Sequence, residues 1–390
     1  MLIYETPLSL CVDDFVVFTN IFYTRDYIYC IGVYYDSEVV GVKVRDTFHM
    51  TFDVDDLPVE AENLYYKNGA NENYNLYRMK NDSGVQQKTL VVYFESKGYR
   101  ITLDPSHYIE ESTRKLSLMT LFKSDYLLIP TYLQHYKALG TRFFSLYYNG
   151  SFADLLDKKN ISTILSNISE DKDIEVRLIE WNYPWRWKKE GYKMCALGQL
   201  SAMTDMLYRS KYQYEYVYYN DLDEFLFIDK KEKEKEKEKE KEKEKEKEEE
   251  KRGCYMEALL DKYKDYDTLI FNMYWSDYCN EHTVVQTNGI RTITAENLQK
   301  GFTTNNFIIN DLANTNDTLN KSRTKYIIKT SSHFSLNIHR PFKQYYVSNG
   351  KGEKEEKGVL IHLRLNDLRL DGFFHILNLN EKIRLSFLSK

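Results

Sequence analysis

Two patterns of hydrophobic and polar residues divide the chain near residue 112. Residues 1–112 alternate short runs of aromatic and β-branched residues with polar turns, a pattern typical of a small β-rich module. Beyond residue 112, apolar runs of strand length alternate with amphipathic stretches of helix length. This alternation favours a mainly parallel sheet with helices on both faces. We therefore predict an α/β domain over residues 113–390, preceded by the β-rich module.

The strands and helices expected in the α/β domain follow one another in a regular order. Strands are predicted over residues 116–122, 143–148, 174–181 and 216–219, and helices over residues 126–139, 153–168 and 194–210. We expect the first of these helices to end at Gly140. Parallel sheets bind their ligands beyond the carboxyl ends of the strands, so we expect the ligand-binding and catalytic residues at that edge.

Two charged segments interrupt this order. Residues 231–250 contain only Lys and Glu, and without an apolar residue they cannot pack against a core. We predict a disordered insert over residues 230–252. A second, shorter charged segment predicts a loop over residues 350–358.

The composition narrows the class of protein. Hydrophobic residues make up 42% of the 390 residues, which is enough for a substantial core. The formal net charge of −5 gives no reason to expect nucleic acid as a partner. The five cysteines are scattered without a Cys-x-x-Cys pair, which favours reduced thiols. The sequence shows no signal-peptide pattern and no apolar stretch near the ~20 residues of a membrane span, so we expect a soluble cytoplasmic protein.

A strand that ends in three carboxylates is the main chemical signal. Residues 216–219 are aromatic or β-branched, and Asp221, Asp223 and Glu224 follow closely. Carboxylates at the rim of a buried sheet are costly unless a cation compensates them. Mg²⁺ and Mn²⁺ prefer such oxygen ligands and commonly bridge a protein to a diphosphate. The pattern indicates a metal site at Asp221 and Asp223, with Glu224 as support; a carboxylate cluster that caps a helix is the alternative.

Seven segments, taken in order, carry a resemblance to a known family. They are residues 121–128, 135–140, 144–149, 198–209, 221–225, 323–329 and 361–364. In these segments the chain resembles glycosyltransferase family 92 and related GT-A-type transferases. The resemblance implies a GT-A-like (Rossmann-like) fold, Mn²⁺ or Mg²⁺, a nucleotide-sugar donor, a carbohydrate or glycoconjugate acceptor, and transfer with inversion.

The resemblance also implies roles for charged residues late in the chain. His362 is the best match to a further histidine ligand of the metal, and His339 is the second choice. Arg323, Lys325 and Arg364 would neutralise the leaving diphosphate. Ordinary surface charges are the alternative for these three residues.

Four residues nearer the start of the domain are implied as donor contacts. By analogy, Lys123 and Asp125 follow the first strand and lie near the nucleotide base or ribose. Gln199 and Asp205 lie on the helix that borders the donor pocket in the family. At ~100° per residue the two side chains point roughly 120° apart, and a polar helix face is the alternative for them.

The candidate catalytic base lies in residues 271–282. An inverting transfer needs a general base that takes the proton of the acceptor hydroxyl. These residues indicate a strand that opens into a polar loop, and Asp277 and Glu281 are the candidate bases in it. The segment departs from the small-residue loop that is usual in the family, which leaves the base and the acceptor open.

Two other functions stay open from the sequence. A nucleotidyl- or phosphotransferase on a similar fold could use the same aspartates, and it would release pyrophosphate rather than a nucleoside diphosphate. A catalytically degenerate transferase could serve as a glycan-binding or interaction protein. The hypothesis that we carry forward is a metal-dependent hexosyltransferase that uses a UDP-hexose such as UDP-galactose.

Overall fold

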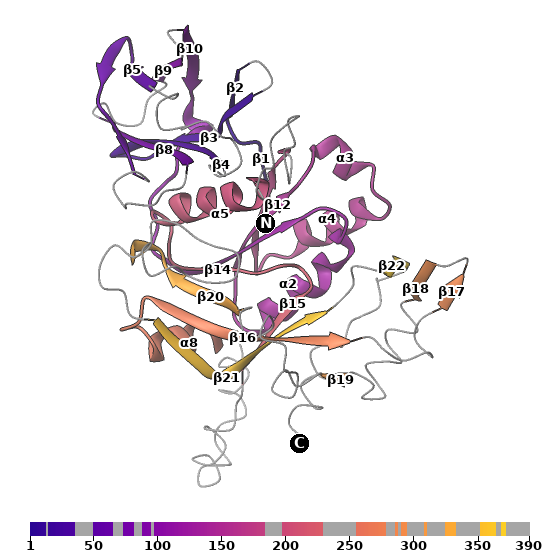
Figure 1. The fold of residues 1–390 in the computed structure, drawn as a ribbon. Helices are drawn as coiled ribbons and strands as arrows, with labels where there is room; N and C mark the ends of the chain where they lie inside the picture. The colour runs from indigo at the N-terminus through magenta and orange to yellow at the C-terminus, as the bar shows by residue number, and fades with distance from the viewer. Residues whose placement is uncertain are drawn as a thin grey trace.

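The described strands form one large sheet, two small sheets near the N-terminus and a three-stranded sheet (Figure 1). The computed structural model describes residues 1–12, 15–35, 50–64, 73–81, 88–94, 97–183, 197–228, 255–277, 285–287, 290–294, 308–309, 324–332, 352–363 and 368–371. The three-stranded sheet contains β17 (Val285–Thr287), β18 (Ile290–Thr294) and β22 (Leu368–Asp371). The Lys/Glu insert predicted over residues 230–252 lies outside the described residues.

The large sheet joins strands from distant parts of the chain. Its order is β1-β13-β12-β11-β14-β20-β16-β21-β15, and β19 pairs with β16. The strands are β1 (Leu2–Glu5), β11 (Arg114–Phe122), β12 (Phe143–Tyr148), β13 (Glu175–Glu180), β14 (Tyr214–Tyr219), β15 (Glu224–Ile228), β16 (Thr268–Asp277), β19 (Ile308–Ile309), β20 (Thr324–Lys329) and β21 (Gly352–Leu363). Four of them, β11 to β14, confirm the strands predicted from the sequence.

The first half of the large sheet is parallel. β1, β13, β12, β11 and β14 all run in the same direction. The helical segments between these strands are η4 (Tyr126–Leu128), α2 (Ile129–Ala138), α3 (Phe152–Leu156), α4 (Ile161–Glu170) and α5 (Leu197–Ser210). Gly140, with a φ of 102°, follows α2 as the sequence predicted. This half confirms the expected alternation of strands and helices.

The second half of the sheet is mixed. β20 is antiparallel to both β14 and β16, whereas β21 is parallel to β16 and antiparallel to β15. Residues 352–358, for which the sequence predicts a charged loop, form the first part of β21. Gly352 is opposite Thr268, and Gly358 is opposite Ile228. Main-chain pairing with two neighbouring strands therefore decides the conformation of this charged segment.

Helices cover both faces of the large sheet, as predicted (Figure 1). On one face, Leu118 and Phe122 of β11 share a core with α2, α4 and α8 (Tyr255–Lys262). On the other face, Met119 and Leu121 of the same strand share a core with α5 and with strands of the N-terminal module. Side chains that alternate along one strand thus contribute to two separate cores. No helix in the described part of the chain is long and apolar enough to cross a membrane.

The N-terminal module contains two small sheets, which confirms its β-rich character. Their orders are β2-β3-β4-β8-β7 and β10-β9-β5-β6. The strands are β2 (Leu10–Val12), β3 (Phe15–Tyr23), β4 (Tyr27–Tyr35), β5 (Met50–Val54), β6 (Leu57–Val59), β7 (Ala61–Asn63), β8 (Asn73–Lys80), β9 (Lys88–Phe94) and β10 (Lys97–Leu103). A core that includes Phe18, Ile28 and Leu90 lies between them. β1 pairs with β13, so the first strand of the chain belongs to the large sheet.

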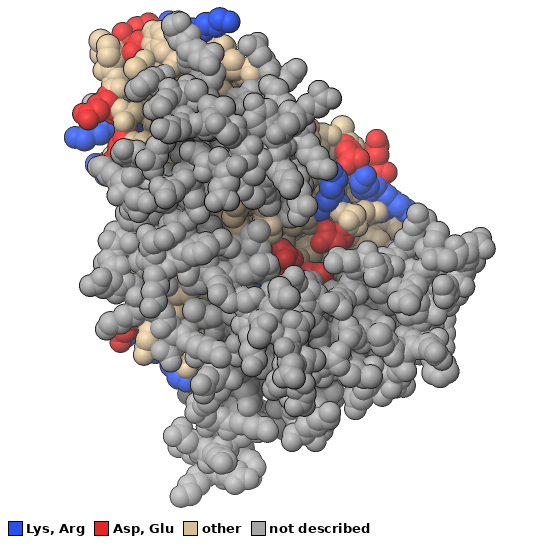
Figure 2. Space-filling model, in the orientation of Figure 1, with Lys and Arg blue, Asp and Glu red and all other residues tan. Residues whose placement is uncertain are grey.

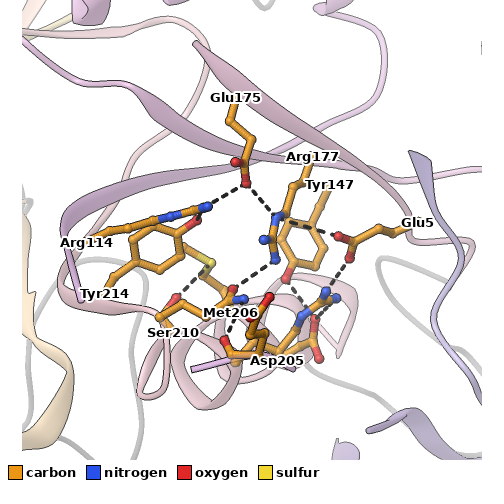
Figure 3. Close-up of polar contacts among 12 residues, drawn as sticks. Glu5, Arg114, Tyr147, Glu175, Arg177, Asp205, Met206, Ser210 and Tyr214 are labelled. Atoms are coloured by element: carbon orange, nitrogen blue, oxygen red, sulfur yellow. Dashed lines mark hydrogen bonds and ion pairs between the residues drawn. The ribbon is translucent and has the colours of Figure 1, made fainter. Parts of the chain in front are cut away.

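A network of buried charges joins β1, β13 and α5 (Figure 3). Arg177 donates a hydrogen bond to Glu175 (3.2 Å) and lies 3.7 Å from the carboxylate of Glu5. Glu5 also accepts a hydrogen bond from Arg209, whose guanidinium lies 3.8 Å from the Asp205 carboxylate. The network therefore ties an edge strand of the sheet to the helix that packs on it.

Burial and charge pairing compete in this network. Burial raises the pKa of Glu5, but the charges of Arg209 and Arg177 outweigh it and hold that pKa below its ordinary value. Burial lowers the pKa of Arg209, and the charges of Glu5 and Asp205 outweigh this effect and raise it. For Asp205, burial prevails and the pKa is raised. Arg209 is thus the cation that both carboxylates share.

We predict that Arg209→Met lowers the free energy of unfolding by about 3–5 kcal/mol, because the buried Asp205 and the partly buried Glu5 lose a shared cation. Urea denaturation followed by circular dichroism measures this loss. Lys158→Met is the control, since Lys158 pairs with Asp154 on the exposed surface and such pairs contribute little. An Arg209→Met protein as stable as the control would contradict the role given to the network.

Candidate active site

The carboxylates predicted from the sequence lie in a tight turn between β14 and β15. At the end of β14, the Asn220 N–H donates to the carbonyl of Met119 in β11 (3.2 Å). The Glu224 N–H donates to the Asp221 carbonyl (3.0 Å) and closes the turn. Asp221 and Asp223 are half-buried, whereas Glu224 is only 1% exposed. The turn therefore presents two carboxylates to the surface and one to the interior.

This turn lies at the edge of the large sheet where the parallel strands end (Figure 1). Because β11 and β14 are parallel, Asp125, which follows β11, lies at the same edge. β16 is parallel to β14, since both are antiparallel to β20, so its last residue, Asp277, also lies there. His362 of β21 is directly opposite Glu224 of β15. The topology brings residues from four segments to the edge where parallel sheets bind ligands.

Side chains of α2 hold the turn through buried hydrogen bonds. The Tyr132 hydroxyl donates to Asn220 Oδ1 (2.6 Å). The Tyr136 hydroxyl donates to the Glu224 carbonyl (3.0 Å) and accepts from Asn220 Nδ2 (2.7 Å) and from the Leu226 N–H (3.2 Å). Asn220 Nδ2 also donates to the Glu224 carbonyl (3.0 Å). Two tyrosines four residues apart on one helix thus fix both ends of the turn.

A lysine of β20 occupies the inner side of the turn. The Nζ atom of Lys325 lies 3.1 Å from Asp221 Oδ2 and 3.1 Å from Glu224 Oε2. The Lys325 side chain is 0% exposed. Burial lowers the pKa of Lys325, but the charges of Asp221 and Glu224 outweigh burial and raise it above its ordinary value. Lys325 is therefore a charged ammonium in the interior.

A second line of contacts reaches Asp221 from α5. The buried side chain of Gln199 donates a hydrogen bond from Nε2 to the Tyr219 hydroxyl. This hydroxyl donates in turn to Asp221 Oδ1 (3.0 Å). The predicted donor contact Gln199 is therefore connected to the turn through Tyr219.

Asp125 adds a carboxylate from the end of β11. Its Oδ1 atom accepts a hydrogen bond from the backbone N–H of Lys123 (3.1 Å), whose side chain is exposed. Burial, followed by the negative charges of Asp223 and Asp221, raises the pKa of Asp125 to about 6. Asp125 at the end of β11 and the carboxylates of the turn therefore lie close enough for their charges to interact. Figure 2 shows acidic side chains within a hollow of the surface and basic side chains beside it.

Asp205 lies apart from this cluster. It is fully buried and accepts hydrogen bonds from Asn20 Nδ2 (2.6 Å) and from the Tyr147 hydroxyl (2.7 Å). Asn20 belongs to β3 of the module and Tyr147 to β12 of the large sheet. Of the two predicted donor contacts on α5, Gln199 points toward the turn and Asp205 joins the module to the sheet.

Other predicted site residues lie where the structure describes no side chain. Glu281, Arg323 and Arg364 are outside the described residues. For Asp277 and His362, the strand position is described and the side chain is not. Their catalytic and binding roles stay predictions.

A comparison with protein families decides the class of enzyme that carries this site. The model of glycosyltransferase family 92 matches residues 116–386. The chain belongs to glycosyltransferase family 92. It is therefore a glycosyltransferase that acts on a sugar donor and an acceptor, and the resemblance seen in the seven segments is confirmed. The match begins within β11 and includes Asp125, the turn and Lys325, but not the N-terminal module. A comparison with curated proteins gave no match.

The oxygen atoms of this family 92 site suit a hard divalent cation. Mg²⁺ and similar ions usually take one or two carboxylates from the protein and complete their shell with water and substrate phosphates. Asp221 and Asp223 fit this pattern, and their charges contribute, after burial, to the raised pKa of Asp125 beside them. Among the side chains that the structure describes, no group of three or more His, Cys, Asp or Glu is arranged as a complete metal site. Asp221 and Asp223 are the described carboxylates that could hold such an ion.

Sequence analysis missed the roles of several side chains that shape this family 92 site. Tyr132 and Tyr136 are visible in the sequence as aromatic residues one helical turn apart, but their spacing does not show that the hydroxyls reach the turn. Tyr219 is one of the aromatic residues of the predicted strand, and nothing in that pattern indicates that its hydroxyl bonds Asp221. Lys325, predicted as a contact of the diphosphate, is buried against Asp221.

We predict that Tyr136→Phe lowers the free energy of unfolding by about 1–3 kcal/mol, because buried donors of Asn220 and Leu226 lose their acceptor. Donor hydrolysis should also slow, since both ends of the turn lose a contact. Tyr126→Phe is the control, because its hydroxyl bonds only the carbonyl of Lys159 near the surface. Equal stability and equal rates of donor hydrolysis for the two variants would contradict the role of the Tyr136 hydroxyl in holding the turn.

We also predict a pH-dependent gain in stability from Asp125→Asn. The folded pKa of about 6 exceeds the ordinary value of 3.8, so ionised Asp125 opposes folding. This penalty is complete above about pH 6 and disappears below about pH 4. The thermal midpoint of the variant should therefore exceed that of the wild type near neutral pH, with a gain that shrinks as the pH falls.

Asp154→Asn serves as the control for this prediction. Hydrogen bonds from Lys158 and Tyr148 hold the pKa of Asp154 below its ordinary value, so its substitution should not raise the midpoint near neutral pH. A lower midpoint for Asp125→Asn under the same conditions would show that the carboxylate of Asp125 is not destabilising.

Proposed function

We propose that this family 92 glycosyltransferase is a metal-dependent enzyme of the GT-A type. It transfers a hexose from a UDP-hexose, such as UDP-galactose, to a hydroxyl group of a glycan or another acceptor, with inversion. The observation that carries this proposal is the turn after β14, which holds Asp221 and Asp223 at the carboxyl edge of a parallel sheet. Ligands of such sheets bind at this edge, and the raised pKa of Asp125 favours a cationic partner.

Asp221 and Asp223 would hold Mn²⁺ or Mg²⁺, which when bound supplies positive charge for the departing diphosphate. His362, opposite Glu224 in the sheet, stays the proposed further ligand. Arg323 directly precedes β20 in the sequence, and Arg364 directly follows β21. Both remain proposed partners of the diphosphate, because arginine suits phosphate oxygens.

Side chains at the same edge of the sheet are proposed to bind the nucleotide and to act as the general base. Asp125 and Lys123, at the end of β11, are the proposed contacts of the base or ribose. A carboxylate must take the proton of the acceptor hydroxyl while the anomeric carbon is attacked from the face opposite the diphosphate. Asp277, the last residue of β16, and Glu281 shortly after it are the candidates for this role.

We predict that Asp223→Asn abolishes donor hydrolysis and sugar transfer while leaving the fold intact. The substitution removes a charged oxygen ligand but keeps the shape of a half-buried side chain. Release of nucleoside diphosphate from UDP-hexoses measures the activity, and circular dichroism checks the fold. Asp173→Asn is the control, since Asp173 pairs with Lys137 before β13, at the opposite edge of the sheet.

Removal of divalent ions with EDTA should stop the same reaction, and Mn²⁺ should restore it. Full activity of Asp223→Asn, or full activity in EDTA, would overturn the proposed function. Release of pyrophosphate would instead favour a nucleotidyl transfer. A wild-type protein that binds no UDP-sugar in calorimetry with Mn²⁺ would favour a degenerate transferase.

A further inference from the structure

Lys325 is placed to hold Asp221 rather than to bind a ligand. Its ammonium contacts one oxygen of Asp221 and one of Glu224, each at 3.1 Å. The ammonium also lies 4.6 Å from the centroid of the Tyr219 ring, within the range of a cation–π contact. Among the described residues, these three groups contact the charge, and 0% of the Lys325 side chain is exposed. A phosphate group could reach Lys325 only if the atoms that cover it moved.

The contacts around Lys325 fix both the backbone and the side chain of Asp221. Glu224 Oε2, which binds Lys325, also accepts a hydrogen bond from the Asp221 N–H (2.9 Å). Asp221 Oδ2 binds Lys325, and Asp221 Oδ1 accepts from the Tyr219 hydroxyl (3.0 Å). The side chain of Asp221 nevertheless stays 30% exposed. Both carboxylate oxygens are therefore held by the protein, while part of the side chain stays exposed.

We infer that Lys325 is a positioning residue: it orients the Asp221 carboxylate toward the ligand side and does not itself contact the leaving diphosphate. The inference rests on the proposed function, because it concerns the carboxylate to which we assign the metal. It replaces the role in charge neutralisation that the sequence suggested for Lys325. Groups that orient a metal-binding side chain in this way typically change metal affinity by about 10–100-fold when they are removed.

A single substitution of Lys325 would not separate positioning from stability. Lys325→Met leaves the buried charge of Glu224 without its cation, which destabilises a fold strongly. The double variant Lys325→Met/Glu224→Gln removes one charge of each sign and keeps an acceptor for the Asp221 N–H. The net charge beside Asp221 is unchanged, so any loss of cation binding reports the orientation of Asp221.

The experiment measures binding of Mn²⁺ alone to the full chain by isothermal titration calorimetry, together with thermal unfolding. The double variant should unfold near the wild-type temperature and bind Mn²⁺ about tenfold or more weakly. Lys115→Met/Glu215→Gln is the matched control, because Lys115 at the start of β11 bridges Glu215 (3.0 Å) and Asp261 (2.9 Å) away from the turn. This control should bind Mn²⁺ as the wild type does.

The outcomes separate the role of Lys325 from the proposed function. One outcome would overturn only the role of Lys325. In it, the folded double variant binds Mn²⁺ with wild-type affinity, while Asp223→Asn binds no Mn²⁺. A wild-type protein that binds no Mn²⁺ would overturn both the metal-dependent function and this role. If Lys325→Met alone is unstable and the double variant regains stability without regaining Mn²⁺ binding, the positioning role is supported.

Discussion

The burial of Glu224 is the constraint on which the site depends. A carboxylate that is 1% exposed is tolerated in an interior only when a cation and hydrogen bonds compensate it. Lys325 supplies the cation, and because the same ammonium contacts Asp221, the compensation of one carboxylate orients another. The Asp221 N–H completes this arrangement by donating to Glu224. The charged turn is thus ordered by the protein's own groups, before any substrate is considered.

The charge network near α5 shows how carboxylates are compensated by arginines where they only hold the fold together. There, carboxylates and guanidinium groups face one another in balanced numbers: the partly buried Glu5 and Glu175 and the buried Asp205 against Arg114, Arg177 and Arg209. At the turn, the charges of Asp223 and Asp221 still contribute to the raised pKa of Asp125. Perturbed titration in a cluster at a sheet edge is typical of ligand sites. Burial raises the pKa of Asp205 in the network as well, so a raised pKa alone does not separate the two places. The physical reason to place the chemistry at the turn is that its half-buried carboxylates lie at the carboxyl edge of the parallel strands.

The parts of the fold that local patterns decide could be predicted from the sequence. Strand and helix periodicity placed β11 to β14 and the helices between them, and an apolar strand followed by acids identified the Asp221 turn. Pairing between distant segments could not be predicted in this way. Lys325 comes 104 residues after Asp221, and only the register that sets Tyr326 opposite Tyr219 brings the two together. The charged residues 352–358 likewise became a strand because two partners paired with them.

Helix α5 gives the N-terminal module a physical connection to the site, although the module carries no catalytic pattern of its own. Near the start of this helix, Gln199 bonds the tyrosine that holds Asp221. Farther along, Asp205 bonds Asn20 of the module, and Arg209 bonds Glu5 of β1. The helix lies between the module and the large sheet and shares a core with both (Figure 1). One helix of 14 residues thus carries contacts to the module, to the edge strand β1 and to the turn. The module is connected to Asp221 through α5 and Tyr219, because Asn20 bonds Asp205 and Gln199 of the same helix bonds Tyr219.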